Sequence, residues 1–211
     1  MLAFLVDNWL GVAGFISGIA CVWLLIRENV LTFPIGLLYA GLSVVVMLEA
    51  RLYADVLLNG YYVLMNAYGW YFWLYGRRAG LANDAADHVS VERLPQRQWL
   101  VLAAVLVAGS VSMGYYFDNF TDADLAYPDS LSTVLSFIAM WMAAKKYLEN
   151  WILWFVVDVF YVVLYLVKAQ QSPDLYFYAG LYFVYLVMAV AGYRAWLHSL
   201  SDRSANQALT T

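Results

Sequence analysis

The sequence predicts an all-α integral membrane protein with seven transmembrane helices. Of its 211 residues, 64% are hydrophobic and 12% are charged, whereas soluble domains carry about 25% charged residues. A helix needs about 20 apolar residues to cross the hydrocarbon core of a bilayer. Candidate segments follow one another along the whole chain: Trp9–Ile26, Val30–Leu48, Tyr53–Tyr75, Trp99–Phe117, Leu131–Ala144, Trp151–Val167 and Leu175–Leu197.

Most connections between these segments are only a few residues long, so neighbouring helices are expected to run antiparallel. The longest connection, from Gly76 to Gln98, is polar and is the best candidate for a linker. The fifth segment is short and has an alternative start near Tyr127.

Basic residues predict the orientation, because cytoplasmic loops carry an excess of Lys and Arg. With the N-terminus outside, nine basic residues fall in cytoplasmic segments and two outside. The cytoplasmic set is Arg27, Arg77, Arg78, Arg93, Arg97, Lys145, Lys146, Arg194 and Arg203, and the outer set is Arg51 and Lys168. The loop after the fourth segment agrees, since it holds only acidic charges, at Asp118, Asp122, Asp124 and Asp129. We therefore expect an outer N-terminus and a cytoplasmic C-terminus.

Two three-helix units can be aligned with one another. Near the ends of the third and seventh segments, a glycine is followed one turn later by a tryptophan: Gly69 and Trp73, and Gly192 and Trp196. At the ends of the first and fifth segments, a tryptophan stands one turn before a basic residue: Trp23 and Arg27, and Trp141 and Lys145. Three helices reverse the chain direction, so one linking helix makes the second triplet parallel to the first. Parallel repeats of this kind characterise the SWEET transporters, and transporter substrates bind near the bilayer midplane at the repeat interface.

The sequence thus predicts a SWEET-like 3+1+3 parallel repeat with four regions. Residues 1–76 form the first repeat, and residues 127–200 form the second. Residues 77–126 hold a cytoplasmic loop, the linker helix and an acidic outer loop. Residues 201–211 are polar, and we expect them to be a disordered tail.

Asp158 is the only ionisable residue near the middle of any of the seven segments. A charge at that depth costs about 2.5–3.5 kcal/mol on insertion scales, so it usually faces a polar cavity with a function there. One stripe of the sixth helix holds, given their spacing, Trp151, Trp154, Asp158, Tyr161 and Tyr165. We expect this stripe to line a ligand site.

Further polar and aromatic residues extend the candidate site. Aromatic faces attract a cation with about 0.5–2 kcal/mol each, and amides and tyrosine hydroxyls bind hydroxyl groups or an exocyclic amide. A flat cationic ring that carries hydroxyls would use all of these groups. The candidate binding residues are Asn59, Tyr62, Asn66, Trp70, Asn150, Trp151, Trp154, Asp158, Tyr161 and Tyr182.

Structural interpretations stand beside these roles. Asn59 and Asn66 are equally suited to hydrogen bonding between helices, and Asp158 to pairing with tyrosine or asparagine side chains. Asn150 either caps a helix or lies at the mouth of the cavity. Tryptophans near segment ends usually anchor a helix at the membrane interface; we interpret Trp9, Trp73, Trp99 and Trp196 in this way, and leave both roles open for Trp151.

Missing motifs argue against several other classes of protein. Both histidines, His88 and His198, lie outside the segments, so no intramembrane histidine metal site is expected. The chain has no HExxH, GxSxG or P-loop motif, and its last segment lacks the lysine of a retinal protein. We expect no enzymatic activity, metal or cofactor. The net charge of −4 is small and says little about partners, and the sequence has no basic cluster that would suggest nucleic-acid binding.

Two motifs resemble those of the Pnu vitamin transporters. One is the run from Glu149 to Trp154 followed by Asp158, and the other is Tyr53–Asn59 leading to Tyr68–Trp73. The resemblance covers nearly the whole chain. It implies a SWEET-like fold and facilitated diffusion of nicotinamide riboside across a bacterial inner membrane, with uptake driven by a cytoplasmic kinase that phosphorylates the vitamin. It also implies a homotrimer.

The identity of the ligand and the mode of action remain open. Relatives in this family also carry thiamine, whose thiazolium ring suits a carboxylate as well as the pyridinium of nicotinamide riboside does. A seven-helix receptor or sensor would bind the same ligand without moving it. A proton-coupled carrier would use Asp158 as its proton site.

Overall fold

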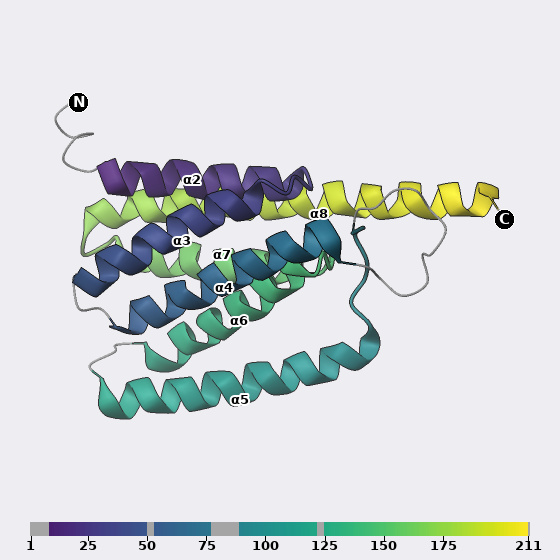
Figure 1. Cartoon of the computed structure of the whole chain (residues 1–211). Coiled ribbons are helices and arrows are strands. Elements are labelled where there is room, and N and C mark those ends of the chain that lie inside the picture. Colours follow the sequence, from purple (N-terminus) through teal and green to yellow (C-terminus); the bar gives the residue numbers. More distant parts are fainter. Residues whose placement is uncertain (1–8, 50–52, 77–88, 122–124, 211) are drawn as a thin grey trace. The chain divides into compact units, whose positions relative to one another are not determined.

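The computed structural model describes residues 9–49, 53–76, 89–121 and 125–210. Within these ranges the regular elements are helices, and the seven predicted helices are confirmed (Figure 1). They are α2 (Trp9–Ile26), α3 (Thr32–Glu49), α4 (Tyr53–Tyr75), α5 (Gln96–Phe120), α6 (Ala126–Ala144), α7 (Asn150–Lys168) and α8 (Tyr176–Thr210), with a short 3-10 helix η1 (Pro173–Leu175) before α8. Several charged residues used to predict orientation, and one histidine, lie outside the described residues: Arg51, Arg77, Arg78, His88, Asp122 and Asp124.

The helix boundaries follow the sequence closely at most places and differ at two. α2 and α4 have the predicted bounds, whereas α6 begins at Ala126, close to its alternative start and well before Leu131. α8 continues through residues 201–210, which the sequence predicts as a disordered tail. Its last turns carry helix-compatible polar contacts, including Ser201 Oγ donating to the His198 carbonyl at 2.8 Å. At about 1.5 Å per residue, α8 exceeds the roughly 30 Å of a hydrocarbon core.

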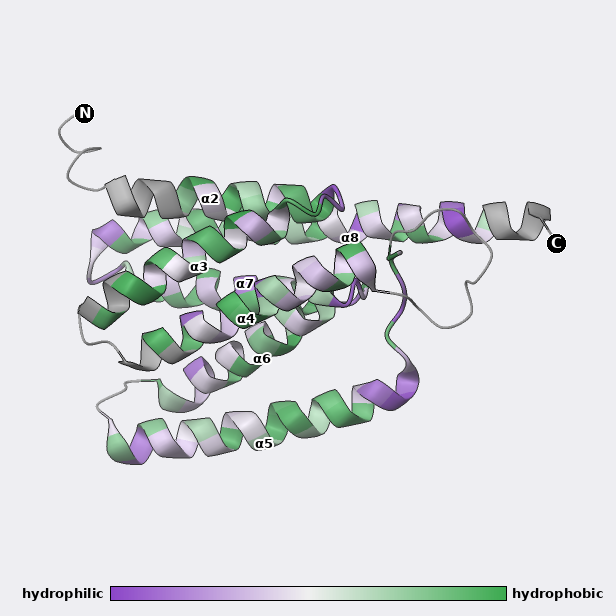
Figure 2. Ribbon diagram, in the orientation of Figure 1, coloured by the Kyte–Doolittle hydropathy of each residue, from purple (hydrophilic) through white to green (hydrophobic). Residues whose placement is uncertain are grey.

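Length and composition mark several of these helices as membrane spans. Three described segments are long and apolar enough to cross a bilayer: Gln96–Phe120, Asn150–Lys168 and Pro173–Ala205. Phe15–Ile26 and Thr32–Val45 are shorter apolar helical segments. Figure 2 shows α5 with hydrophilic residues at its start, strongly hydrophobic turns after them, and paler, mixed turns toward its end.

The chain divides into two compact units, Met1–Val89 and Ser90–Thr211. In the first unit, α3 packs against both α2 and α4. In the second, α5 packs on α6, α6 on α7, and α7 on α8. The division falls inside the polar connection that the sequence predicts as a linker.

The corner between α2 and α3 has the same backbone hydrogen bonds as the corner between α6 and α7. Two residues after the end of each helix lies a residue with positive φ, Glu28 at 53° and Lys146 at 61°. In the first corner, Asn29 N–H donates to the carbonyl of Leu24 at 2.9 Å. In the second, Tyr147 N–H donates to Met142, also at 2.9 Å. The neighbouring bonds recur as well, and together they form the Schellman pattern that closes a helix end.

A second similarity lies where α3 meets α4 and where α7 meets α8. In each unit an aromatic ring near the start of one helix occupies the space beside a glycine of the next: Phe33 beside Gly69, and Trp151 beside Gly192. The same rings meet a tryptophan edge-on, with centroids 4.9 Å apart for Phe33–Trp73 and 5.5 Å for Trp151–Trp196. Both ring pairs are inclined by 85°.

These contacts correct one prediction from the sequence. Trp73 and Trp196 were expected to be interfacial anchors, but they are 5% and 0% exposed. They pack inside their own units because a glycine one turn earlier lets the partner ring approach the helix backbone. Trp99, by contrast, is exposed, as an interfacial anchor would be.

The segment before α5 is packed against the α6–α7 corner. Glu92 N–H donates to the Lys146 carbonyl at 3.1 Å, and Leu148 N–H donates to the Glu92 carbonyl at 2.8 Å. The carboxylate of Glu149 accepts the Leu94 N–H at 2.8 Å. This part of the predicted linker is therefore an ordered strap, formed by residues 90–95.

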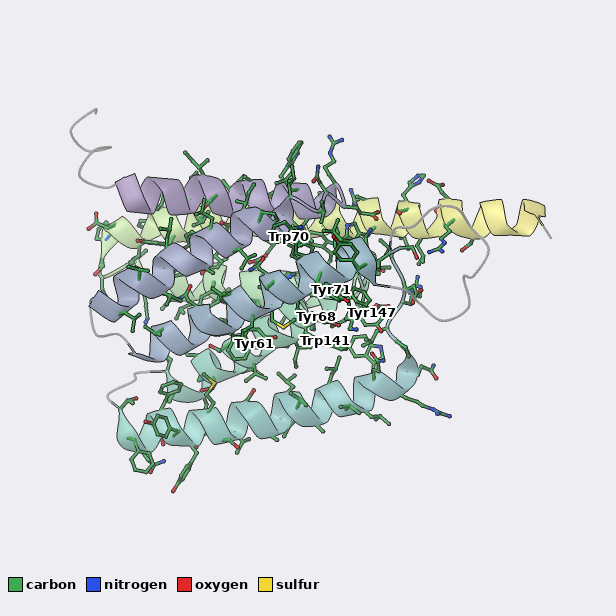
Figure 3. The ribbon with its side chains drawn as sticks, in the orientation of Figure 1. Tyr61, Tyr68, Trp70, Tyr71, Trp141 and Tyr147 are labelled. Atoms are coloured by element: carbon green, nitrogen blue, oxygen red, sulfur yellow. The ribbon has the colours of Figure 1, made fainter. Side chains whose placement is uncertain are left out.

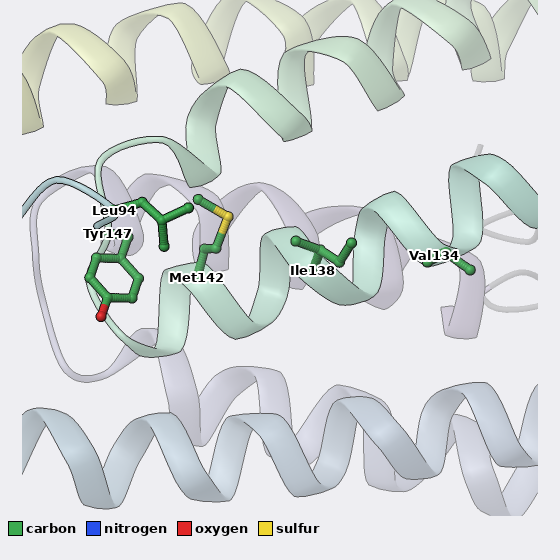
Figure 4. Packing of buried hydrophobic residues seen from close by; sticks show 5 residues of the cluster. All are labelled: Leu94, Val134, Ile138, Met142 and Tyr147. Atoms are coloured by element: carbon green, nitrogen blue, oxygen red, sulfur yellow. The ribbon is translucent and has the colours of Figure 1, made fainter. Parts of the chain in front are cut away.

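Leu94 joins a hydrophobic cluster that runs along one face of α6. The cluster holds Leu94, Val134, Ile138, Met142 and Tyr147 (Figure 4). Tyr147 also contacts Trp141, with ring centroids 5.8 Å apart (Figure 3). These contacts fix the corner from which α7 begins, and α7 carries Asp158.

Candidate functional site

Asp158 lies in the middle of α7 and is 5% exposed. Within the described part of the chain, no group donates a hydrogen bond to its carboxylate and no basic side chain pairs with it. A buried charge without a partner is costly, so natural proteins pair such charges or use them to hold a ligand. The structural alternative, in which tyrosine or asparagine side chains satisfy Asp158, gains no support from this geometry.

Four tyrosines of α7 and α8 stack in an alternating column near Asp158. Tyr161 lies on Tyr182 with centroids 4.7 Å apart and planes inclined by 23°. Tyr165 stacks on Tyr182 at 5.5 Å and on Tyr178 at 5.5 Å. Tyr182 is within electrostatic reach of Asp158, Tyr161 and Tyr165. Because offset stacked rings stabilise one another by about 0.5–1.5 kcal/mol, this column fixes the α7 stripe against α8.

The hydroxyl group of Tyr161 is tied to a third helix. It lies 3.1 Å from Oγ of Ser132, a residue of α6 that is 2% exposed. The Ser132 Oγ also donates to the carbonyl of Asp129 at 2.9 Å. α6, α7 and α8 therefore meet at the tyrosine column.

The remaining α7 candidates lie nearer its first turn. Asn150 is fully buried and its Nδ2 donates to the Tyr147 carbonyl at 2.7 Å, which is a role in the corner. Trp151 is 2% exposed and packs on Gly192 and Trp196, so its ring lies in the helix–helix contact. Trp154 is half-buried, one turn before Asp158.

The candidates of α4 belong to the first unit. Asn66 is 7% exposed, and its Nδ2 donates to the Tyr62 carbonyl at 2.8 Å. Its amide also fills the space beside Gly36 of α3, where a Cβ would lie 2.3 Å from Oδ1. Asn59 and Tyr62 are half-buried, and Trp70 is 39% exposed (Figure 3).

The structure thus brings together Asp158, Tyr161 and Tyr182 of the predicted set, and adds Tyr165, Tyr178 and Ser132, which that set does not contain. Tyr165 and Tyr178 have the same helical spacing as their neighbours, which is a signal that the sequence already carries. Ser132 gives no such signal, because it is one of several small polar residues in α6. Only the packing of α6 on α7 identifies it.

Chemically, this region offers an uncompensated carboxylate, several aromatic faces and tyrosine oxygens. A carboxylate is an acceptor only, and it favours a cation or a strong hydrogen-bond donor. Aromatic faces nearby add cation–π attraction. The arrangement fits a flat, positively charged guest that carries hydroxyl or amide hydrogens.

The chain is similar to several known vitamin transporters. The chain resembles the nicotinamide riboside transporter PnuC of Escherichia coli K12, with 25% identity over 94% of this chain and 89% of that protein. It resembles the riboflavin/roseoflavin transporter RibM of Streptomyces davaonensis with 25% identity over 89% of this chain and 84% of that protein. The crystal structure of the vitamin B3 transporter PnuC matches with a TM-score of 0.69 and 25% identity, covering 95% of this chain and 85% of that one.

The sequence profile of one transporter family also matches residues 8–198, which is nearly the whole chain and includes every candidate residue. Membership of this family indicates transport rather than catalysis and, with the apolar helices, a multi-pass membrane protein. The chain belongs to the nicotinamide mononucleotide transporter family.

Proposed function

We propose that this protein is a facilitated-diffusion transporter of nicotinamide riboside. The observation that carries the proposal is the buried carboxylate of Asp158, which has no protein partner within the described residues. Nicotinamide riboside combines a permanently charged pyridinium ring with a carboxamide and ribose hydroxyls. Its charge would meet the carboxylate, and its remaining groups would meet amides and tyrosine oxygens.

The roles of the candidate residues follow from their chemistry. Asp158 neutralises the ring cation, and Trp154, Tyr161 and Trp70 supply aromatic faces. Asn59, Asn66 and Tyr182 hold hydroxyl or amide groups, with Tyr62, Asn150 and Trp151 at the edges of the site. Asn150 and Trp151 contribute mainly through the α6–α7 corner, given their buried packing contacts.

The charge at Asp158 favours nicotinamide riboside over an uncharged vitamin. The flavin ring of riboflavin is neutral at pH 7, so it gives a buried carboxylate no counter-charge. Thiamine is cationic and stays the second candidate. Two similar proteins, one from Escherichia coli and one of solved structure, bear the names of nicotinamide riboside and vitamin B3 transporters, which places that ligand first.

Alternating access would come from two triplets arranged as a SWEET-like 3+1+3 parallel repeat, in which α5 is the linking helix. The matching hydrogen bonds of the α2–α3 and α6–α7 corners support this repeat. The matching ring contacts at Gly69 and Gly192 support it independently. In transporters built from such repeats, alternating access comes from rocking of one repeat against the other around the substrate site.

The proposal extends to location and partners. Membership of the family, with a similar protein in Escherichia coli, favours a bacterial inner membrane. The distribution of basic residues favours an N-terminus outside and a C-terminus in the cytoplasm. A cytoplasmic kinase would phosphorylate the vitamin and so keep its free concentration low inside. We also expect a homotrimer, which mass measurement in native membranes or detergent would test.

The test is a titration of the purified protein with nicotinamide riboside and thiamine side by side, followed by uptake into liposomes. We expect binding of nicotinamide riboside and saturable uptake that a proton gradient does not change. Asp158→Leu should abolish binding while the protein still inserts and folds. Binding without uptake would identify a receptor or sensor instead, and uptake that follows the proton gradient would identify a proton-coupled carrier.

A further inference from the structure

The hydrogen bonds of Ser132 fix the direction of its contact with Tyr161. A serine hydroxyl has one hydrogen and two lone pairs. Ser132 already donates that hydrogen to the carbonyl of Asp129 at 2.9 Å. On geometry alone either oxygen can donate in the 3.1 Å contact between the two hydroxyls. Because the serine hydrogen is used at Asp129, we assign the tyrosine as the donor. The only hydroxyl hydrogen of Tyr161 is thus used inside the protein.

We propose that Ser132 is a positioning residue for the ligand site, and that it makes the Tyr161 hydroxyl an acceptor only. This inference rests on the proposed function, because it concerns the same site. Ser132 acts from α6 and holds a ring on α7 that stacks on Tyr182 of α8 at 4.7 Å. The serine thereby sets both the angle of the ring and the direction of its hydroxyl dipole.

The consequence concerns the hydrogen bonds that a guest can make. Asp158 lies three residues before Tyr161, and side chains at that spacing are neighbours on a helix. An ionised carboxylate can only accept hydrogen bonds. The same holds for a tyrosine oxygen whose hydrogen is already donated to another group. The pair therefore selects a guest that brings positive charge and N–H or O–H donors. Without Ser132, the hydroxyl hydrogen of Tyr161 would be free to donate to the carboxylate and so compete with the guest.

The other buried serines of α6 provide a matched control. Ser130 is 1% exposed, and its Oγ donates to the carbonyl of Ala126 in its own helix at 2.7 Å. Ser136 does the same toward the carbonyl of Ser132 at 2.8 Å. Replacing Ser130 by alanine removes a hydroxyl as buried as that of Ser132, and it leaves the contact between Ser132 and Tyr161 in place.

A double-mutant cycle tests the proposal. Ser132→Ala, Tyr161→Phe and the double variant are titrated with nicotinamide riboside, beside Ser130→Ala, and their thermal unfolding is measured. In the wild-type background, Ser132→Ala should weaken binding about two- to tenfold, the range expected for one hydrogen bond. In the Tyr161→Phe background it should have no further effect, because the hydroxyl is already gone. Ser130→Ala should bind as the wild type does.

Each contrary outcome has a distinct meaning. Equal affinity losses in both backgrounds, or unchanged affinity with a lower unfolding temperature, would reduce Ser132 to a helix-packing residue and overturn the inference alone. Failure of the folded wild-type protein to bind nicotinamide riboside would overturn the proposed function and the inference with it.

Discussion

Asp158→Asn should change affinity and stability in opposite directions. The substitution keeps the size and shape of the side chain and removes its charge. No described group pairs with the carboxylate, so the folded protein loses no internal interaction with it. Removing the charge should instead relieve much of the roughly 2.5–3.5 kcal/mol that a carboxylate costs in mid-membrane. The variant is therefore expected to fold at least as well as the wild type.

The effect on binding can be estimated from the burial of this residue. At 5% exposure, Asp158 is poorly screened by water. Two unit charges about 4 Å apart attract by about 4 kcal/mol at an effective dielectric constant of 20, and a hydrogen bond to a charged group contributes about 1.5–3 kcal/mol. A loss of about 2–4 kcal/mol lowers affinity by roughly 30- to 1,000-fold.

The assay is calorimetric titration of purified protein with nicotinamide riboside, together with thermal unfolding of each variant. Asp174→Asn is the control, because it removes the same charge from an exposed position in η1. That control should bind as the wild type does. If Asp158→Asn is folded and binds nicotinamide riboside with wild-type affinity, the charge has no part in recognition and the reasoning fails.

Two further predictions concern packing. Gly192→Ala should lower stability by about 1–3 kcal/mol, because its Cβ would lie 2.5 Å from the ring of Trp151. Gly180→Ala is the control and should cost little, because its Cβ would meet no atom within 4 Å. Equal unfolding temperatures of these two variants would contradict the ring–glycine contact. Glu149→Leu should destabilise the protein by about 1–3 kcal/mol, because it leaves the buried Leu94 N–H without an acceptor. Hydrogen exchange at the Leu94 amide should accelerate in this variant. Unchanged exchange would show that the strap is not held by this carboxylate.

Hydropathy was sufficient to predict the helices, because an apolar segment inside a bilayer must satisfy its own backbone hydrogen bonds and therefore forms a helix. It located α2 and α4 to the residue. For α6 the apolar run alone began too late, at Leu131, because Tyr127, Pro128 and Asp129 dilute the apolar signal, although proline is well tolerated in a first helical turn. The alternative start near Tyr127 lies one residue from the observed start at Ala126. Hydropathy also missed the end of α8, where polar residues continue the helix beyond the apolar run.

The candidate site was only partly predictable. Spacing assigns residues to a helix face, but it does not identify the side chains of other helices that pack against that face. The stripe of Asp158 and Tyr161 followed from spacing alone. The stacking on Tyr182 and the bond to Ser132 depend on how three helices pack, so only the structure gives them. Trp196 was misjudged for the same reason: its place near a helix end fits an anchor, and its contact with Trp151 buries it.

The most direct test of the central claim is uptake of labelled nicotinamide riboside by liposomes that contain the purified wild-type protein. Facilitated diffusion predicts saturable entry that stops when the inside and outside concentrations are equal, and continued accumulation when a nicotinamide riboside kinase and ATP are enclosed. Entry no faster than into protein-free liposomes, by protein that is folded and correctly inserted, would contradict the claim.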